Sequence, residues 1–392
     1  MNPLRLPRGV WALGFVSLFM DLSSEIVHAL LPIFMVGTLG ASAAAVGLIE
    51  GLAEGAASIV KVFSGWFSDR LGRRKPLAVA GYGLAALTKP LFALAPALSW
   101  VFAARLTDRL GKGIRGAPRD ALVADLTEPG ERGAAYGLRQ SLDTVGALIA
   151  PLAAVGLMVL FAGDVRAVFW IAAIPAAISV AILIIAVKEP PRADVPAAPA
   201  APPISLRAAL HPGAFGPVFW QVAALAATLT LARFSEAFLI LRGSEMGFGP
   251  AFAPLVMAAM ATAFALSAYP AGWLSDRLGR WRMLTAGVLV LIVADMMFAF
   301  GRTPPLALAG AVLWGLHMGL TQGLFAAMIA DAAPARLRGS AFGIFHLLSG
   351  IVIFAASLIA GGLWDAFGSQ AAFLAGAGFA TLALLGLIAF RR

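Results

Sequence analysis

The sequence has no cysteine and very little charge. Without cysteine it can form no disulfide bonds and no thiolate metal sites. Only 12% of its 392 residues are charged, whereas 60% are hydrophobic and the mean hydropathy is +0.89. These values exclude an ordinary soluble globular protein and indicate a chain that lies largely in a membrane.

Motifs for several kinds of chemistry are also missing. The sequence contains no G-x-x-x-x-G-K-[ST] loop, so we do not expect ATP to be an energy source. It shows no nucleophile–base pair, no metal-ligand cluster and no soluble domain, which argues against a membrane-embedded enzyme or a sensor. We therefore expect no catalytic residues, no metal site and no cofactor.

Basic residues outnumber acidic ones, giving a net charge of +9 and a pI near 10.7. In a soluble protein this excess would suggest nucleic-acid binding. In a membrane protein, loop arginines that face an anionic leaflet give the same value. We therefore expect contact with membrane lipid and no nucleic-acid partner.

Long apolar runs, each near the ~20 residues that a membrane helix needs, divide the chain into twelve expected spans. These are 9–36, 43–66, 75–96, 99–125, 134–160, 165–187, 214–240, 248–273, 282–301, 304–330, 339–363 and 368–390. An even number of spans puts both termini on one side, and most loop arginines and lysines lie on that side too. The opposite side has near its boundaries only Lys89, Arg166, Arg242 and Arg302. The positive-inside rule then predicts a multi-pass protein of a bacterial-type inner membrane with both termini in the cytoplasm.

Two pairs of segments repeat along the chain. GWFSDRLGRRKPL at 65–77 recurs as GWLSDRLGRWR at 272–282, and ADLTEPGERGAAYG at 124–137 recurs as ADAAPARLRGSAFG at 330–343. The shift is about 206 or 207 residues in both pairs, which indicates two like halves. We expect an N-terminal half at 1–187, a semi-rigid Pro/Ala-rich cytoplasmic linker at 188–213 and a C-terminal half at 214–392.

The repeated loop resembles a known family motif. The G-x-x-x-D-R-x-G-R-[KR] loop of the major facilitator superfamily, between its second and third helices, is similar to the segment with Gly65, Asp69, Arg70, Gly72, Arg73 and Arg74. The copy at 272 falls where that family repeats the loop, between helices eight and nine. The family's fourth-helix motif and the loop after it resemble Arg109-x-Gly111-x-Gly113 followed by Asp125 and Glu131-Arg132-Gly133.

The resemblance implies an all-α integral membrane fold, with twelve helices in two pseudo-symmetric six-helix halves around a central cavity. It also implies a charge cluster that stabilises the state closed on the cytoplasmic side, and so biases the conformational equilibrium rather than recognising substrate. The residues expected to act in this conformational role are Gly65, Asp69, Arg70, Gly72, Arg73, Asp125, Arg132, Asp276 and Arg280. The segment from Gly146 to Pro151 is similar to the G-x-x-x-G-P motif of the family's drug antiporters, with Ala150 in place of the second glycine.

Basic residues inside the expected spans form a second feature. Five of them lie in span four, at the three-to-four residue spacing that keeps side chains on one helix face. They are Arg105, Arg109, Lys112, Arg115 and Arg119. One charge at the bilayer centre costs about 2.5–3.5 kcal/mol, so this face must meet water or acidic partners. The remaining basic residues inside spans are Lys61, Arg139 and Arg233.

The acidic candidates lie in spans one, two and five, and are Asp21, Glu25, Glu50, Glu54 and Asp143; His28 lies one turn beyond Glu25. A rise of about 1.5 Å per residue puts Asp21 and Glu25 level with Lys112 and Arg109. The same estimate puts Asp143 level with Arg115, so we expect the charges to pair in layers. In the family that the chain resembles, helices one and four line the central cavity, which would put these layers on the substrate path. The alternative is that the pairs only fasten helices together.

The repeat provides a comparison for this basic stripe. A shift of 206 maps Arg109 to Gly315, Lys112 to Met318, Arg115 to Thr321 and Arg119 to Phe325. Because the stripe does not recur, we expect it to serve a function of the N-terminal half. His317 and Gln322 of span ten, with His346 of span eleven, are expected as polar lining of the other half. Arg233 and Glu236 are expected to pair near the outer end of span seven.

We therefore expect a monomeric, proton-coupled secondary transporter that works by alternating access and exports an anionic or carboxylate-bearing small molecule or a metal chelate. Two alternatives are a multidrug exporter of cationic or neutral lipophilic compounds and a proton symporter that imports an organic anion. In the expected mechanism, substrate and proton compete at Asp21 and Glu25. The expected substrate and coupling residues are Asp21, Glu25, His28, Glu54, Arg105, Arg109, Lys112, Arg115, Arg119, Asp143, His317 and Gln322.

Overall fold

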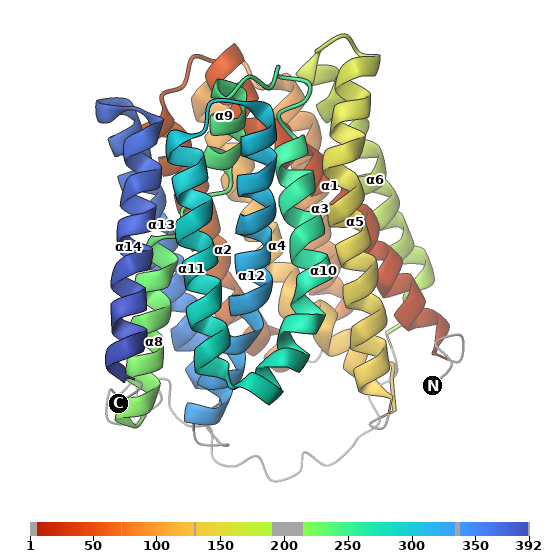
Figure 1. Cartoon of the computed structure of the whole chain (residues 1–392). Helices are drawn as coiled ribbons and strands as arrows, with labels where there is room; N and C mark the ends of the chain where they lie inside the picture. Colours follow the sequence, from red (N-terminus) through yellow and green to blue (C-terminus); the bar gives the residue numbers. More distant parts are fainter. Residues whose placement is uncertain (1–5, 72, 129–130, 190–214, 334–337, 391–392) are drawn as a thin grey trace.

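The computed structural model describes residues 6–71, 73–128, 131–189, 215–333 and 338–390, and within them every regular element is a helix. Figure 1 shows the helices side by side in one bundle. They are α1 (Arg8–Ile33), the short π-helix η2 (Phe34–Thr38), α2 (Ala43–Leu71), α3 (Lys75–Leu94), α4 (Leu98–Asp125), α5 (Arg132–Leu160), α6 (Val165–Ala186), α8 (Pro217–Leu231), α9 (Ala237–Glu245), α10 (Leu255–Leu278), α11 (Arg280–Phe300), α12 (Pro304–Ala332), α13 (Arg338–Phe367) and α14 (Ser369–Phe390).

Ten of the described helices are long and apolar enough to cross a membrane. The two expected crossings outside this set have clear reasons to be exceptions. Helix α4 carries the stripe of basic residues, which makes its sequence much more polar than those of the other long helices. The seventh crossing is divided between α8 and α9. Together these elements make the twelve crossings that the sequence predicts.

The seventh span is therefore not the continuous helix expected at 214–240. Residues Ala232–Glu236 are not helical, and α9 continues after them to Glu245. Two side chains satisfy backbone groups that the interruption frees: the Ser235 amide donates to Ser357 Oγ at 3.1 Å, and the Ala237 amide donates to Ser235 Oγ at 3.3 Å. Such partners are what allow a broken helix inside a membrane. The eighth span correspondingly begins at Leu255 rather than at 248.

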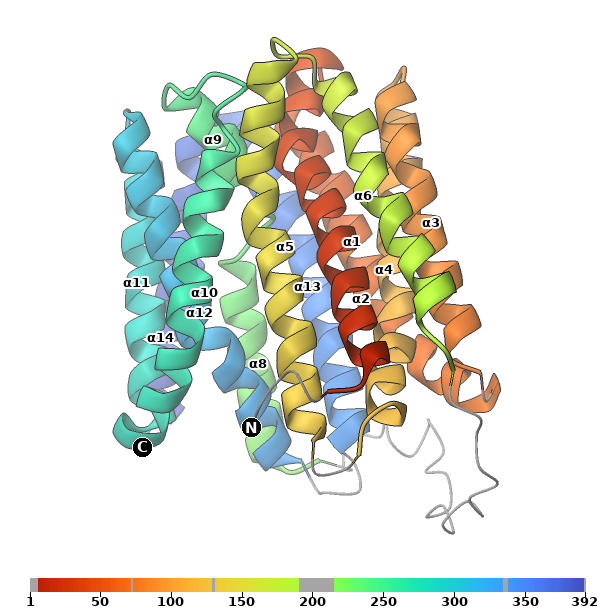
Figure 2. The ribbon, with the colours of Figure 1, turned by 90° about the vertical axis from the view of Figure 1, so that its right-hand side faces the viewer.

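Helix α1 begins and α14 ends at the same end of the bundle, here called the terminal end; the opposite end is the distal end (Figure 1). We call α1–α6 the N-terminal helix group and α8–α14 the C-terminal helix group. In Figure 2, α1–α4 and α6 lie on the right and α9–α12 and α14 on the left, with α5, α8 and α13 between them. The division at 187 and 214 stays a prediction, because most of the intervening linker lies outside the described residues.

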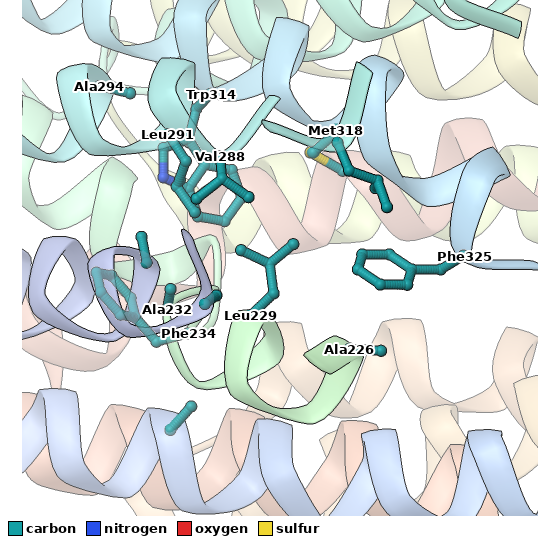
Figure 3. Close-up of a cluster of buried hydrophobic side chains, with 14 of the residues drawn as sticks. Ala226, Leu229, Ala232, Phe234, Val288, Leu291, Ala294, Trp314, Met318 and Phe325 are labelled. Atoms are coloured by element: carbon teal, nitrogen blue, oxygen red, sulfur yellow. The ribbon is translucent and has the colours of Figure 1, made fainter. Parts of the chain in front are cut away.

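Buried apolar side chains form three clusters. One lies within α1 and α3–α6, and another, of which Figure 3 shows a part, lies almost wholly within α8–α14. The third joins the two groups near the distal end, where Ile26–Met35 of α1 and η2 cluster with residues such as Ala237, Ile240 and Met257. Because this joint cluster is distal, the helix groups are packed together there.

Glycines bring α2 and α13 very close at the same end. A Cβ added to Gly47 would lie 2.2 Å from the carbonyl oxygen of Ser357, and one added to Gly51 would lie 3.1 Å from Phe354. The Asp365 carboxylate of α13 also accepts hydrogen bonds at 2.9 Å from the amides of Ala43 and Ala44, at the start of α2. The distal contact is thus backbone against backbone, and it leaves no room for larger side chains.

The repeat found in the sequence recurs in the packing. A Cβ at Gly81 of α3 would meet α4 at Gly111 O and Arg115 Cβ, at 2.7 and 2.8 Å. At the position 206 residues later, a Cβ at Gly287 of α11 would meet Thr321 Cγ2 of α12 at 2.5 Å. Because Thr321 is also 206 residues after Arg115, the α3–α4 contact is repeated by the α11–α12 contact.

Candidate functional site

Three of the five basic residues in the stripe of α4 are buried inside the protein. Arg105, Arg109 and Arg115 expose 1%, 1% and 4% of their surface. Helix α4 packs against α2 and α3, with further contacts to α1 and α5. The stripe therefore meets the acidic residues of α1, α2 and α5, as the cost of charge in a membrane requires.

The stripe begins, on its distal side, with a buried ion pair. Arg105 Nη2 lies 2.6 Å from Glu50 Oε2, and the Glu50 side chain is fully buried. His28 joins this layer: its Nε2 is 3.8 Å from Glu50, and its Nδ1 is 3.3 Å from Glu25 Oε2. Glu50 is one of the acidic candidates found in the sequence, but it is not among the expected substrate and coupling residues.

Around the middle of α4 the charges are more accessible. Arg109 Nε lies 3.2 Å from Glu54 Oε1, and the Glu54 side chain is 35% exposed. Lys112, the next basic residue of the stripe, is exposed and forms no ion pair or hydrogen bond among the described residues. It is nevertheless close enough to Asp21, Glu25 and Glu54 to interact electrostatically with all three.

Asp21 and Asp143 do pair with basic residues of α4, as predicted, but their partners lie at other positions along that helix. Asp21 pairs with Arg115 at 3.7 Å and not with Lys112, and Asp143 contacts Arg119 at 3.9 Å and not Arg115. Both partners lie about one turn nearer the terminal end than predicted. Cα depths set the predicted levels, whereas the side chains of a helix tilt toward its N-terminus. Since α4 starts at the distal end, its long side chains reach back to acids that lie about one turn further from the terminal end.

The Asp143 carboxylate also interacts with its own helix, because Arg139 Nη1 lies 3.5 Å away. Arg119 is further held by Asp120 at 2.9 Å. The terminal-end part of the stripe is therefore a network of several acids and bases, whereas Lys112 in the middle has no close partner among the described residues.

A second buried ion pair was missed by the sequence analysis. Lys89 Nζ lies 2.7 Å from Asp108 Oδ1 and 3.1 Å from Ser24 Oγ, and the lysine is 1% exposed. The sequence analysis placed Lys89 near the opposite membrane boundary and assigned it no partner, whereas the structure shows it buried and paired. The available signal was Asp108 itself, an acid within span four that needs a basic partner when buried.

The corresponding place among the described residues of α8–α14 has no ion pair. A shift of 206 maps Lys89 to Asp295 and Asp108 to Trp314, and there the Trp314 indole donates to Asp295 Oδ1 at 3.3 Å. Met318 and Phe325, which stand where α4 has Lys112 and Arg119, belong to the apolar cluster of Figure 3. The C-terminal helices therefore build the same contacts largely with uncharged residues.

The three residues expected as polar lining among the C-terminal helices differ in how exposed they are. His317 is fully buried, with Nδ1 2.8 Å from the Gly287 carbonyl oxygen, so it is not an exposed lining residue. Gln322 and His346 are half-buried. The expected pair of Arg233 and Glu236 does not form: both lie in the interruption of the seventh span, and no ion pair among the described residues joins them.

Only some of the residues expected to act in the conformational role lie in the described part of the structure. Gly72 lies outside the described part of the structure, and so do the side chains of Asp69, Arg70 and Asp276, whereas Gly65 lies within α2. Asp125 is held by Arg74, with Nη1 to Oδ2 at 3.0 Å, while Arg73 and Arg132 are exposed. Arg280 pairs with Asp331 in the other helix group. Asp331 lies 206 residues after Asp125, whereas Arg280 aligns with Arg73 in the repeated loop. The two ion pairs therefore use equivalent aspartates and neighbouring arginines of the motif.

Gly146, the first glycine of the antiporter-like motif, lies at a close contact between α5 and α1. A Cβ there would be 2.4 Å from the Leu18 carbonyl oxygen. Ala150, which replaces the motif's second glycine, is fully buried. The small residues of this segment therefore allow the two helices to approach.

Taken together, the twelve crossings, the repeated contacts and the charges held inside the bundle are features of a membrane transporter built from two like halves. The family model of the Major Facilitator Superfamily matches residues 13–357 and 234–392. The chain belongs to this superfamily, whose members are transporters of small molecules and not enzymes.

Relatives and solved structures agree with this assignment. An MFS-type transporter of Methanocaldococcus jannaschii is 29% identical over 377 residues, covering 93% of this chain and 90% of the relative. The multidrug resistance protein MdtH of Yersinia pestis is 36% identical over 146 residues, which is 37% of this chain and 36% of that protein. The structure of the nucleoside transporter NupG has a TM-score of 0.79 at 17% identity and covers 100% of both chains. A point mutant of the peptide transporter POT, in complex with sulfate, has a TM-score of 0.82 at 15% identity and covers 98% of this chain and 94% of that one. At this identity the structures support the fold alone.

Proposed function

We propose that the protein is a proton-coupled secondary transporter of the inner membrane, with both termini in the cytoplasm, that exports a carboxylate-bearing small molecule by alternating access. In this orientation the terminal end is cytoplasmic. The tight α2–α13 contact then closes the outer side, and the charged middle of α4 is reached from the cytoplasm.

The observation that carries the proposal is the position of Lys112. It is exposed among the partly exposed carboxylates of Asp21, Glu25 and Glu54, at 21%, 19% and 35%. Charges at this depth cost about 2.5–3.5 kcal/mol each against lipid, so the space that they border holds water or a solute. Each of these acids has a basic neighbour within ion-pair distance, whereas Lys112 has none among the described residues, so a carboxylate is the complementary group for it.

Proton coupling is assigned to Asp21 and Glu25. A carboxylate can couple transport when it is ionised in one conformation and protonated in the other. Asp21 is partly exposed, and its only basic contact among the described residues, with Arg115, is long at 3.7 Å. Glu25 is held by His28 and interacts electrostatically with Lys112. Substrate bound at Lys112 would compete with protons at these two acids.

The test uses inside-out membrane vesicles with an imposed proton gradient. Uptake of a carboxylate probe, such as benzoate, should exceed uptake of the lipophilic cation tetraphenylphosphonium and collapse with a protonophore. Lys112→Gln should lower carboxylate uptake about tenfold or more, the effect of one charge-assisted hydrogen bond. Lys188→Gln, which changes an exposed lysine at the terminal end, is the matched control. Asp21→Asn and Glu25→Gln should abolish the response to the gradient while the protein still folds; full coupling in both would refute their role.

The second candidate function is export of cationic or neutral lipophilic compounds, favoured by the partial similarity to MdtH. In that case the carboxylates bind the substrate, and the arginines serve only as ion-pair partners within the protein. The same vesicles separate the two: preferential uptake of tetraphenylphosphonium, unaffected by Lys112→Gln, supports the second candidate. Uptake only into right-side-out vesicles would indicate import of an organic anion instead.

A further inference from the structure

The interruption of the seventh span lies where the two groups of helices meet. Its Ser235 amide is bonded to Ser357 of α13, next to the close α2–α13 contact at Gly47. The helix that follows, α9, packs against both α1 and α2. Residues Ala232–Glu236 are therefore a segment of the C-terminal helices that faces the N-terminal ones.

Glu236 is the acidic residue of this segment. It is half-buried and, among the described residues, its carboxylate forms no hydrogen bond and no ion pair. Its electrostatic neighbours are Arg233 on the same segment and Glu25, His28 and Glu54 across the boundary, on α1 and α2. Two of the three neighbours across the boundary are themselves carboxylates, so they cannot compensate its charge.

Lys112 of α4 shares two of these electrostatic neighbours. It too interacts with Glu25 and Glu54, and it too lacks an ion-pair partner in the part of the chain that the structure describes. Glu25 and Glu54 are already engaged, by His28 at 3.3 Å and by Arg109 at 3.2 Å. Lys112 and Glu236 are thus opposite charges on different helix groups that share neighbours without contacting each other.

We propose that the transported molecule is a zwitterion, whose carboxylate binds Lys112 and whose ammonium group binds Glu236. The inference rests on the proposed function and narrows its substrate class from carboxylates to amino acids and similar compounds. An unpaired charge inside a membrane protein is costly, and a zwitterion compensates both charges at once. Such a ligand also contacts both helix groups, so its affinity depends on how the groups are arranged, which is the condition for driving a conformational change.

The first experiment compares ligands on the purified full-length protein by isothermal titration calorimetry. The probes are the unbranched ω-amino acids from glycine to 6-aminohexanoate, with the matched monocarboxylates and the matched alkylamines. At least one amino acid should bind about tenfold or more tightly than both of its matched partners. If every amino acid binds no better than its monocarboxylate, or none binds, the inference is wrong. If the monocarboxylates bind nonetheless, the anionic proposal survives; if no carboxylate binds, both fail.

The second experiment uses substitutions with the best amino acid of that series. Glu236→Gln should reduce its affinity to that of the matched monocarboxylate and leave binding of the monocarboxylate unchanged. Lys112→Gln should reduce the affinity for the amino acid to that of the matched alkylamine. A structural role of either residue would instead weaken all probes together. Both substitutions leave every described ion pair intact, so the variants are expected to fold.

The third experiment exchanges the two charges. Lys112→Glu and Glu236→Lys should each weaken binding about tenfold or more, whereas the double variant should restore it, because a zwitterion can bind turned end for end. Additive losses in the double variant would overturn the inference. Lys188→Glu and Glu128→Lys make the same charge changes at exposed terminal-end positions and are the controls. If a charge-exchange variant is not monodisperse, the binding results for Lys112→Gln and Glu236→Gln test the inference instead.

Discussion

Substitution of Asp108 by asparagine should strongly destabilise the protein. The change removes the negative charge but keeps the shape and one acceptor oxygen. Lys89, which is 1% exposed, would then have only neutral oxygens near its ammonium group, those of the asparagine and of Ser24. Breaking a buried ion pair by removing one partner costs about 3–5 kcal/mol, and the retained acceptor puts this case near the lower end.

The reverse substitution should cost less. In Lys89→Met the Asp108 carboxylate keeps two further cations, because Arg105 Nη1 lies at 3.8 Å and Arg109 Nε at 3.7 Å. We expect a loss of roughly 1.5–3 kcal/mol, the range for one hydrogen bond to a charged group. The double variant Lys89→Met/Asp108→Leu leaves no unpaired charge at the lysine, so it should be more stable than Asp108→Asn alone.

The chain provides its own control for this experiment. Asp295→Asn makes the same chemical change at the position related to Lys89 by the 206-residue shift, where Asp295 has an indole donor and no cation among the described residues. An amide oxygen accepts from Trp314 equally well, so the loss should stay within about 1 kcal/mol. Unfolding in mixed micelles by added SDS, followed by tryptophan fluorescence, measures all four variants. Equal losses for Asp108→Asn and Asp295→Asn, or no recovery in the double variant, would refute the argument from charge pairing.

Two further outcomes follow from the helix contacts. Gly47→Leu cannot fit beside the Ser357 carbonyl, 2.2 Å from the added Cβ, so it should open the distal contact. A cysteine introduced at buried Ile49 should then react faster with an impermeant maleimide, with no background because the chain has no cysteine; Gly83→Leu, which has open space around it, should change nothing. Asp125→Asn and Asp331→Asn remove equivalent ion pairs at the terminal end, and both should slow turnover of every substrate, whereas an altered selectivity in vesicle uptake would contradict a purely conformational role.

The crossings and the repeat could be predicted from the sequence because both depend on local patterns. Apolar runs fix where helices lie, and the shift of about 206 or 207 between the repeated segments reappears as equivalent contacts at Gly81 and Gly287. The interruption at Ala232–Glu236 could not be predicted in this way. Hydropathy shows that Arg233 and Glu236 are polar, but a hydrogen bond from distant Ser357 is what stabilises the non-helical backbone.

Which residues belong to the site was easier to predict from the sequence than which of them form pairs. That Asp21 and Asp143 would meet α4 followed from charge and depth, but the one-turn offset depends on the tilt of long side chains toward the distal end. The pair of Lys89 and Asp108 was missed because a basic residue near a helix end is usually a loop residue. Only the packing of α3 on α4 shows that this lysine points into the protein.

A comparison of α4 with α12 separates two possible roles of the charges on α4, helix packing and substrate binding. Both helices pack on their neighbours at equivalent glycines, and the equivalent buried polar pair is Lys89 with Asp108 in one case and Asp295 with Trp314 in the other. A helix in this position therefore does not need a basic stripe in order to pack. Since such a stripe is costly in a membrane, its presence on α4 alone favours a role in binding over a role in assembly. The zwitterion proposal extends this argument, because it assigns the second contact to a residue, Glu236, that belongs to the other group of helices.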